Sequence, residues 1–285
     1  MPHHPALTSG RVAVITGAAS GIGLATALKV AKLGMKLCLA DIDEVALVKA
    51  ADLVGKATGE REKLITVTTD VSKIEDIEQL RDSVYSAFGE VAFLMNNAGT
   101  EGGGQLSGER ERWQKIINVN LWGVVNGIQT FLPLMKEQGT DCAIVNTGSK
   151  QGITCPPGDT AYNISKAGIK VVTEALAHDL RGNEGCRVSA HLLIPGFTFT
   201  GFTKPNTDVK PEAAWMPEQV VDFMLEAMSK GDFYILCPDN SVSRKLDALR
   251  IEWAAGDIIE NRPPLSRWHK DYQHKFSEFV KKSLL

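Results

Sequence analysis

The residues best suited to proton chemistry are a tyrosine and a lysine four positions apart, Tyr162 and Lys166. Positions i and i+4 lie on one face of a helix, so both side chains would point toward the same site. A free tyrosine has a pKa of about 10, and a nearby ammonium favours its phenolate form. The pair therefore suits acid/base catalysis near neutral pH. The alternative is an ordinary solvated helix face, where such spacings are common.

A serine precedes this pair by thirteen residues, directly after a β-rich run: Ser149. Its hydroxyl could donate a hydrogen bond to a substrate oxygen held beside Tyr162, whereas a lone serine is by default a loop residue. The next residue, Lys150, and the nearby Asp159 place unusual charges close to this candidate site. The two could pair with each other, touch a polar substrate, or remain solvated loop charges, as most such residues do.

A glycine-rich turn, TGAASGIG at residues 16–23, separates the first β-rich run from the first helical pattern. Glycines let the backbone approach a pyrophosphate, and the following helix N-terminus supplies N–H donors. A plain tight turn is the alternative, which the flanking strand and helix disfavour. The residues expected at the phosphates are Gly17, Ser20, Gly21, Ile22 and Gly23.

An acidic residue, Asp41, follows the second β-rich run, eighteen residues after Gly23. A carboxylate at this position accepts hydrogen bonds from the adenosine ribose and repels a 2′-phosphate. NADP sites tend to carry an arginine nearby, but the next residue is Ile42 and Ser20 is uncharged. NAD is therefore expected as the cofactor, with Asp41 and Ile42 among the residues that bind it and NADP less favoured. Capping of the helix that begins near Asp43 is a compatible second role for Asp41.

These residues need a scaffold, and the chain alternates short β-rich runs with longer helical patterns. Strands are expected at Arg11–Thr16, Lys36–Ala40, Leu64–Thr68, Val91–Met95, Ala143–Val145, Arg187–Ile194 and Phe233–Cys237. Helices are expected at Ile22–Leu33, Glu44–Gly55, Lys73–Phe88, Glu109–Met135, Ala161–Arg181 and Pro217–Lys230. The alternation predicts an α/β fold, a doubly wound parallel sheet (Rossmann fold) of about seven strands. The carboxyl ends of its strands would bring the glycine turn, Asp41, Asn97 and Ser149 to one edge.

From about Val12 to Cys237 the chain resembles the single-domain branch of the short-chain dehydrogenase/reductase family. The motifs occur in order: TGAASGIG at 16–23, Asp70-Val71, Asn96-Asn97-Ala98-Gly99, Asn120-Leu121, Ser149, YNISK at 162–166, and Pro195-Gly196 with Thr200. One departure is Gly148 before Ser149, where the family often has a second serine. The resemblance implies hydride transfer between nicotinamide and substrate, with Tyr162 exchanging the proton.

The resemblance also implies a role for each motif. Lys166 would lower the tyrosine pKa and bind the nicotinamide ribose, Ser149 would hold the substrate oxygen, and Asn120 would hold a water that links Lys166 to solvent. The remaining cofactor contacts implied are Asp70 and Val71 at the adenine, Asn97, Ala98 and Gly99 along the cofactor, and Pro195, Thr198 and Thr200 at the carboxamide.

The expected activity is that of an NAD(P)-dependent alcohol dehydrogenase or ketone reductase acting on a small secondary alcohol or its ketone. A non-catalytic NAD-binding sensor or scaffold on the same fold is the alternative. An epimerase or dehydratase of the extended branch is disfavoured by the glycine spacing. Three segments could form the substrate pocket: Thr100–Ser107, Gly152–Pro157 and Phe197–Trp215. The third carries Phe197, Phe199, Phe202 and Trp215, which could equally pack on the core.

Three regions are expected along the chain. Residues 1–10 form a disordered tail, 11–237 the catalytic domain, and 238–285 a helical extension packed on the domain or on a subunit interface. Trp268, Tyr272, Phe276 and Phe279 recur at helical spacing in the extension, after a break at Pro263-Pro264, and an active-site lid is a less favoured role for them.

Composition excludes several classes of partner. A formal net charge of -3 does not favour nucleic acid, and no apolar run is long enough for a membrane span. Five scattered cysteines, without a C-x-x-C pair, fit reduced thiols in the cytoplasm. The family resemblance implies a homodimer or homotetramer that uses the Tyr162 helix and the helix before it. No metal site is expected.

Overall fold

The computed structural model describes residues 3–201 and 209–284. In these residues seven parallel strands form one sheet in the order β3-β2-β1-β4-β5-β6-β7. The strands are β1 (Val12–Thr16), β2 (Lys36–Asp41), β3 (Leu64–Thr68), β4 (Phe93–Asn96), β5 (Cys142–Thr147), β6 (Val188–Ile194) and β7 (Tyr234–Leu236). The expected doubly wound parallel sheet is confirmed, with strand ends within three residues of those expected.

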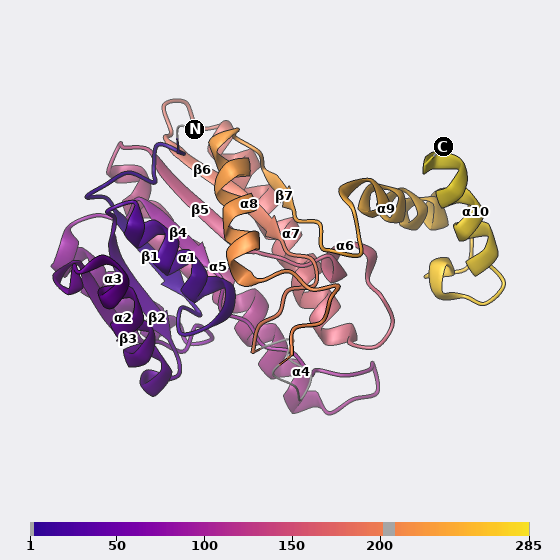
Figure 1. Ribbon diagram of the computed structural model, residues 1–285, viewed down its shortest axis with the longest axis horizontal. Helices are drawn as coiled ribbons and strands as arrows, with labels where there is room; N and C mark the ends of the chain where they lie inside the picture. Colours follow the sequence, from indigo (N-terminus) through magenta and orange to yellow (C-terminus); the bar gives the residue numbers. More distant parts are fainter. Residues whose placement is uncertain (1–2, 202–208, 285) are drawn as a thin grey trace.

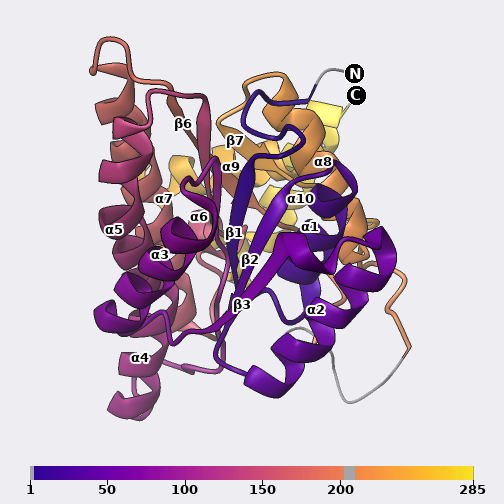
Figure 2. The ribbon, with the colours of Figure 1, turned by 90° about the vertical axis from the view of Figure 1, so that its left-hand side faces the viewer.

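Helices cover both faces of the sheet, as the edge-on view shows (Figure 2). Helices α1, α2 and α8 enclose one core, and α3, α5 and α7 enclose the other, so the strands are apolar on both sides. The helices are α1 (Gly21–Lys32), α2 (Glu44–Thr58), α3 (Ile74–Phe88), α4 (Arg110–Ile117), α5 (Gly123–Glu137), α6 (Gln151–Thr154), α7 (Thr160–Arg181), α8 (Pro217–Ser229), α9 (Arg244–Ile259) and α10 (Gln273–Leu284). Within the described ranges, none of them has the length and apolarity needed to cross a bilayer.

The strand order reverses direction at β1. This strand pairs with β2 on one side and with β4 on the other, and the chain leaves β1 and β4 toward opposite edges of the sheet. In such sheets ligands bind outside the carboxyl ends of the strands at the reversal point. The loops after β1, β4 and β5 therefore border one crevice.

The long helix expected over Glu109–Met135 is interrupted by a π-helical turn, η2 (Asn118–Trp122), which joins α4 to α5. A π turn inserts one extra residue per turn and changes where the following side chains point. Asn120 lies in this turn and is completely buried. The sequence pattern showed the helix but not the turn inside it.

The expected disordered tail is wrong for residues 3–10. Ala6 and Leu7 are buried in the core, and the backbone N–H of Leu7 donates to the carbonyl of His4 at 2.8 Å. The His4 ring packs edge-on against His191 of β6, with ring centroids 5.5 Å apart. Two apolar residues between Pro5 and Thr8 are too short a pattern to identify burial, which explains the error.

The C-terminal extension is helical and projects from the sheet (Figure 1). It consists of α9, the 3-10 turn η3 (Ser266–Trp268) and α10. Phe276 and Phe279 pack on Trp253 of α9, with ring centroids 5.4 and 5.3 Å apart. Because α10 begins only at Gln273, the expected aromatic stripe from Trp268 to Phe279 does not lie on one helix. Its last two rings join the extension's own helices to each other.

Candidate active site

The glycine-rich turn connects β1 to α1 at the carboxyl edge of the sheet. Gly17 has φ of 64°, and a Cβ there would lie 2.8 Å from the Cα of Ala98. A Cβ on Gly23 would lie 2.1 Å from the Gly17 carbonyl oxygen, so neither position has room for a side chain. The Asn97 amide donates to the Thr16 carbonyl at 3.1 Å and fixes the turn against the end of β4.

The Asp41 carboxylate borders this turn at the end of β2. Its Oδ2 accepts a hydrogen bond from the Ala19 backbone N–H at 3.0 Å, and its Oδ1 accepts from the Asp43 N–H at 3.2 Å. Asp43, rather than Asp41, caps α2 by accepting from the Ala46 N–H at 2.9 Å. The side chain of Ile42 is 67% exposed and brings no positive charge to this corner.

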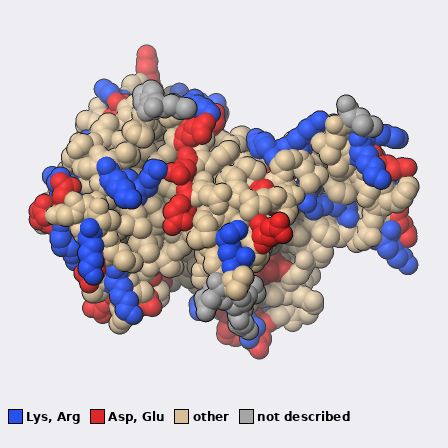
Figure 3. Space-filling model, viewed as in Figure 1, with Lys and Arg blue, Asp and Glu red and all other residues tan. Residues whose placement is uncertain are grey.

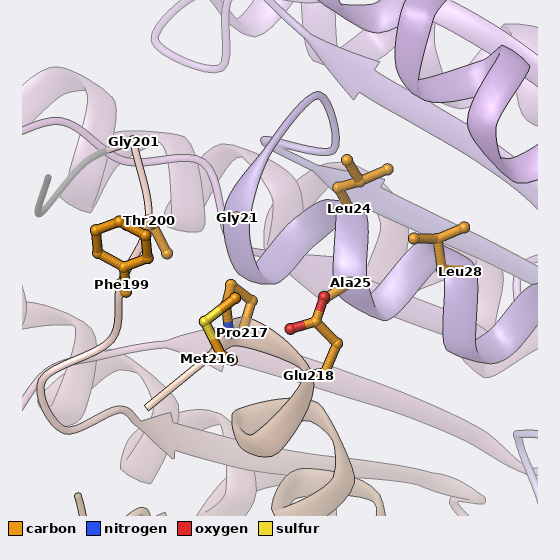
Figure 4. A pocket seen from close by; sticks show the side chains of 10 residues that line it. All are labelled: Gly21, Leu24, Ala25, Leu28, Phe199, Thr200, Gly201, Met216, Pro217 and Glu218. Carbon is orange, nitrogen blue, oxygen red and sulfur yellow. The ribbon is translucent and has the colours of Figure 1, made fainter. Parts of the chain in front are cut away.

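A cavity of about 380 Å³ lies where the start of α1 meets the loop after β6 (Figure 4). It brings together two expected cofactor residues, because the Thr200 methyl would lie 3.2 Å from a Cβ on Gly21. Its lining residues are Gly21, Leu24, Ala25, Leu28, Phe199, Thr200, Gly201, Met216, Pro217 and Glu218. The lining includes Phe199 of the aromatic segment but none of the four expected catalytic residues.

The remaining aromatics of the Phe197–Trp215 segment divide between packing and exposure. A short parallel bridge pairs Thr198 with Trp215, and the Trp215 ring packs on Phe223 of α8 with centroids 6.0 Å apart. Phe197, two residues after Pro195, is 39% exposed. Trp215 therefore packs on the domain, and Phe202 lies outside the described residues.

Tyr162 stands in the first turn of α7, which Asp159 caps by accepting from the Tyr162 N–H at 3.2 Å. Burial raises the pKa of Tyr162 to about 12, and the negative charges of Glu101 and Asp159 act in the same direction. A side-chain hydrogen bond with Ser149 opposes them and lowers the pKa. This bond brings together the hydroxyls of Ser149 and Tyr162.

Lys166 lies one turn after Tyr162 and is buried. Its Nζ donates to the Thr147 carbonyl at the end of β5 at 2.8 Å and lies 5.6 Å from the centre of the Tyr162 ring. Burial lowers the pKa of Lys166 to about 8. The expected lowering of the tyrosine pKa by this lysine is not found, because burial of the phenol dominates and raises it.

Asn120 is held in the π turn by three hydrogen bonds. Its Oδ1 accepts from the Thr100 N–H at 2.7 Å, and its Nδ2 donates to the Thr100 carbonyl at 2.9 Å and to Ser165 Oγ at 3.1 Å. A Cβ on Gly99 would lie 3.4 Å from Asn120 Oδ1 and 3.8 Å from Lys166 Nζ. Asn120 and Lys166 thus both border Gly99, in the loop after β4.

The residues after β3 border the same edge of the sheet. Asp70 Oδ1 accepts from the backbone N–H and the hydroxyl of Ser72 at 3.0 and 2.7 Å. Val71 is buried, and its carbonyl accepts from Asn126 Nδ2 of α5 at 3.0 Å. The Val71 side chain packs so closely on Gly123 that a Cβ there would lie 2.6 Å from it.

Lys150 pairs with neither Asp159 nor solvent. Its Nζ lies 2.6 Å from Asp247 Oδ2 of α9 and 3.3 Å from Asp239 Oδ2. Asp239 Oδ2 also accepts from the Phe197 N–H at 3.3 Å. The lysine therefore joins the loop after Ser149 to the C-terminal extension and to the loop after β6.

Sequence reasoning missed three residues that shape the site. Thr16 Oγ1 accepts from the N–H groups of Asn97 and Ala98 at 2.9 and 3.1 Å, and the Thr147 carbonyl holds Lys166. Thr16 was visible as the first residue of the glycine motif. Glu101 acts only through its charge near Tyr162, which no sequence pattern signals.

Comparisons with known proteins agree with this geometry. The family model for short chain dehydrogenases matches residues 11–210. The chain is 32% identical to 1-deoxy-11-beta-hydroxypentalenate dehydrogenase of Streptomyces exfoliatus over 266 residues, covering 90% of this chain and 94% of that protein. It is 38% identical to the 3-oxoacyl-[acyl-carrier-protein] reductase FabG of Thermotoga maritima over 236 residues, covering 79% of this chain and 93% of the relative.

A solved structure is similar over nearly the whole chain. It is a short chain dehydrogenase/reductase from Burkholderia phymatum in complex with NAD, at 35% identity and a TM-score of 0.80. The alignment covers 90% of this chain and 96% of that one. The match over residues 11–210, together with the sheet order, shows that this chain belongs to the short-chain dehydrogenase/reductase family of oxidoreductases.

Proposed function

We propose that this protein is an NAD-dependent oxidoreductase that interconverts a secondary alcohol and a ketone, with Tyr162 as the general acid/base. The observation that carries the proposal is the side-chain hydrogen bond between Ser149 and Tyr162, with the Lys166 ammonium 5.6 Å from the phenol ring. These groups lie after β5 and on α7, beside the loops that follow β1 and β4. Acid/base groups beside a dinucleotide cradle suit a coupled transfer of hydride and proton.

The residues around the glycine turn fit a dinucleotide. Close contacts at Gly17 and Gly23 leave no room for side chains on these glycines, and the Ser20 side chain makes no capping hydrogen bond at the start of α1. The N-terminal amides of α1 and the Gly17–Gly23 backbone would hold the pyrophosphate. Bound NAD would supply the hydride acceptor, and NADH the donor. The carboxylate of Asp41 favours the ribose hydroxyls of NAD over the 2′-phosphate of NADP.

The protein's own groups would handle the proton. With its pKa raised by burial, Tyr162 is protonated at neutral pH and suited to donate to a carbonyl oxygen during reduction. Ser149 would hold the same oxygen and stabilise charge that develops on it. The Lys166 ammonium, held by the Thr147 carbonyl, would stabilise the phenolate left behind. In the oxidation direction Tyr162 would accept the proton from the alcohol.

The substrate class follows from the same chemistry. The relatives compared above are named a dehydrogenase of a hydroxypentalenate and a reductase of 3-oxoacyl chains. One name contains a hydroxyl group and the other an oxo group. We place the substrate of this chain in the broader class of small alcohols and ketones, next to the partly exposed Phe197 and the loop that carries Glu101.

We also propose that the protein is a homo-oligomer that uses α7 and the long helix that α4, η2 and α5 form. Ile164 and Val171 lie seven residues apart on α7 and are 46% and 62% exposed. Trp122, in the turn η2 that packs against α7, is 52% exposed. Large apolar side chains grouped on one surface are typical of a subunit interface.

The proposed activity is tested by following NADH absorbance with a panel of secondary alcohols and NAD, and with the matching ketones and NADH. NADPH and NADP serve as the alternative cofactors. Turnover of at least one alcohol/ketone pair, with preference for NAD, supports the proposal. Tight NADH binding without turnover across the panel would instead support the sensor alternative.

A further inference from the structure

A second cavity, of about 230 Å³, lies between α6 and the C-terminal extension. Its walls are mostly apolar or aromatic, and the lining residues include Ile153, Trp253, Leu265, Asp257, Arg250 and Arg267. The Trp253 indole N–H donates to Ser266 Oγ at 2.8 Å, which fixes one wall. The cavity shares no lining residue with the cavity beside α1.

The carboxylates at this cavity are already paired with other groups. Asp257 Oδ1 lies 3.0 Å from the Arg262 guanidinium, and its Oδ2 accepts from the Ser266 N–H at 3.0 Å. Asp247, next to the cavity, lies 2.6 Å from Lys150 Nζ. Neither carboxylate is therefore available as a dedicated partner for the arginines that line the cavity.

Two arginines that line the cavity have little negative charge beside them to balance their own charge. Arg250 approaches Asp247 only to 3.7 Å, and its buried Nε has no hydrogen-bond partner in the described part of the chain. Arg267 stacks on the rings of Trp268 and Phe276, at 4.6 and 5.4 Å from their centres. Burial first, and then the charge of Arg250, lower the pKa of Arg267 to about 10. Two guanidinium groups thus face an apolar cavity with excess positive charge.

The surface around the cavity also carries more positive than negative charge. Residues 238–285 contain nine Lys and Arg against seven Asp and Glu, although the whole chain has a net charge of -3. In the space-filling view, basic side chains gather over this lobe, at the right of Figure 3. An anion approaching the extension would therefore be attracted rather than repelled.

We infer that this cavity is a binding site for an anionic amphiphile, a short apolar chain that ends in a carboxylate. The carboxylate would accept hydrogen bonds from Arg250 and Arg267, whose planar guanidiniums match its geometry. The chain would lie against Ile153, Trp253 and Leu265. A water molecule occupies about 30 Å³ of liquid, so 230 Å³ has room for about eight such groups, the heavy atoms of hexanoate.

Binding is measured by NMR titration of the full-length protein with isotope-labelled hexanoate, hexanol and butyrate. Hexanoate should bind about tenfold or more tightly than hexanol, because only the carboxylate can use the arginine charges. Butyrate, which is two methylenes shorter, should bind about fifteenfold more weakly than hexanoate, at roughly fourfold for each lost methylene. Equal affinities for hexanoate and hexanol would overturn the proposal.

Variants then locate the site. Arg267→Gln should weaken hexanoate about tenfold and leave hexanol unchanged, whereas Lys281→Gln, which removes an exposed charge from α10, should change neither. Equal losses of hexanoate affinity in both variants would contradict the assignment. If Arg267→Gln weakens the binding of both ligands, the Arg267→Lys variant decides whether the site is correctly assigned. The site requires Arg267→Lys to keep the preference for hexanoate over hexanol, and loss of that preference refutes it.

Discussion

At the scale of single residues, the protonation of Tyr162 depends on burial more than on its charged neighbours. Burial raises its pKa to about 12, and the Ser149 hydrogen bond only partly offsets the effect. The same burial lowers the pKa of Lys166 to about 8. The proposed proton donor is therefore protonated at neutral pH and suited to reduction, while oxidation would need the less populated phenolate.

This asymmetry predicts different pH dependences for the two directions, because Tyr162 stays protonated near neutral pH and reduction should vary little there. Below the pKa of Tyr162, the phenolate fraction rises about tenfold per pH unit, so kcat/KM for alcohol oxidation should rise with pH. The rise should flatten above about pH 8, where Lys166 loses the proton that stabilises the phenolate. Initial rates measured in both directions test this. A flat oxidation profile between pH 6 and 8 would contradict the assignment of Tyr162 as the base.

Asp41 governs the choice of cofactor in this account. Replacing it in Asp41→Ser removes the charge that repels a 2′-phosphate, and should improve kcat/KM for NADP relative to NAD by about tenfold or more. Because the carboxylate also accepts from the Ala19 N–H, some loss of stability is expected. Asp52→Asn, which removes an exposed carboxylate from α2, is the control and should leave the ratio unchanged. An unchanged ratio in Asp41→Ser would leave the NAD preference unexplained.

At the scale of elements, Lys150 joins parts of the chain that are far apart in sequence. It follows Ser149 and contacts Asp239 after β7 and Asp247 on α9. The side chains of both aspartates are about 95% buried, and Asp239 also holds the Phe197 backbone. The extension is thus fixed to the loop that carries Ser149, the proposed substrate-binding serine.

Breaking this contact should cost more than breaking a surface ion pair. Lys150→Met leaves the buried Asp239 carboxylate without its cation and Asp247 with only Arg250, 3.7 Å away, and should lower the free energy of unfolding by about 3 kcal/mol. Lys230→Met removes an exposed pair with Glu226 and should cost less than about 1 kcal/mol. Urea denaturation of both variants gives the comparison. Equal losses would show that the Lys150 contacts contribute no more than a surface pair.

The sequence predicted most strands and helices, because apolar runs and helical spacing report burial directly. It predicted the positions of Tyr162, Lys166 and Ser149, since these follow from chain order in a parallel sheet. It did not predict the π turn at Asn120, because a π turn leaves no mark in hydrophobic spacing. The sequence also could not predict the partners of Lys150, since they come from the extension, whose packing has no sequence signature.

At the scale of the whole molecule, two regions away from the candidate active site are proposed to bind other molecules. One is the extension with its arginine-lined cavity, and the other is the apolar surface on α7. The N-terminal segment is a third feature, after the π turn and the partners of Lys150, that the sequence pattern did not predict. Ala6 and Leu7 are buried against elements distant in sequence. Burial of this kind depends on tertiary contacts that only the folded chain supplies.

The α7 surface predicts the oligomeric state. Val171→Asp places a charge in the proposed interface and should shift the protein to smaller species in analytical ultracentrifugation, because an unpaired buried charge is costly. Val45→Asp, at a valine of α2 that is 67% exposed, is the matched control and should leave the assembly unchanged. A wild-type protein that sediments as a monomer would rule out the interface.

The proposed function depends on Tyr162 exchanging the proton during nicotinamide-dependent turnover. It is tested by measuring kcat for Tyr162→Phe with NAD and an alcohol that the wild-type protein oxidises. The substitution removes one hydroxyl, so NADH affinity should stay within about threefold while kcat falls by about 10²–10⁴. Turnover at the wild-type rate in Tyr162→Phe, with NADH binding retained, would contradict the account.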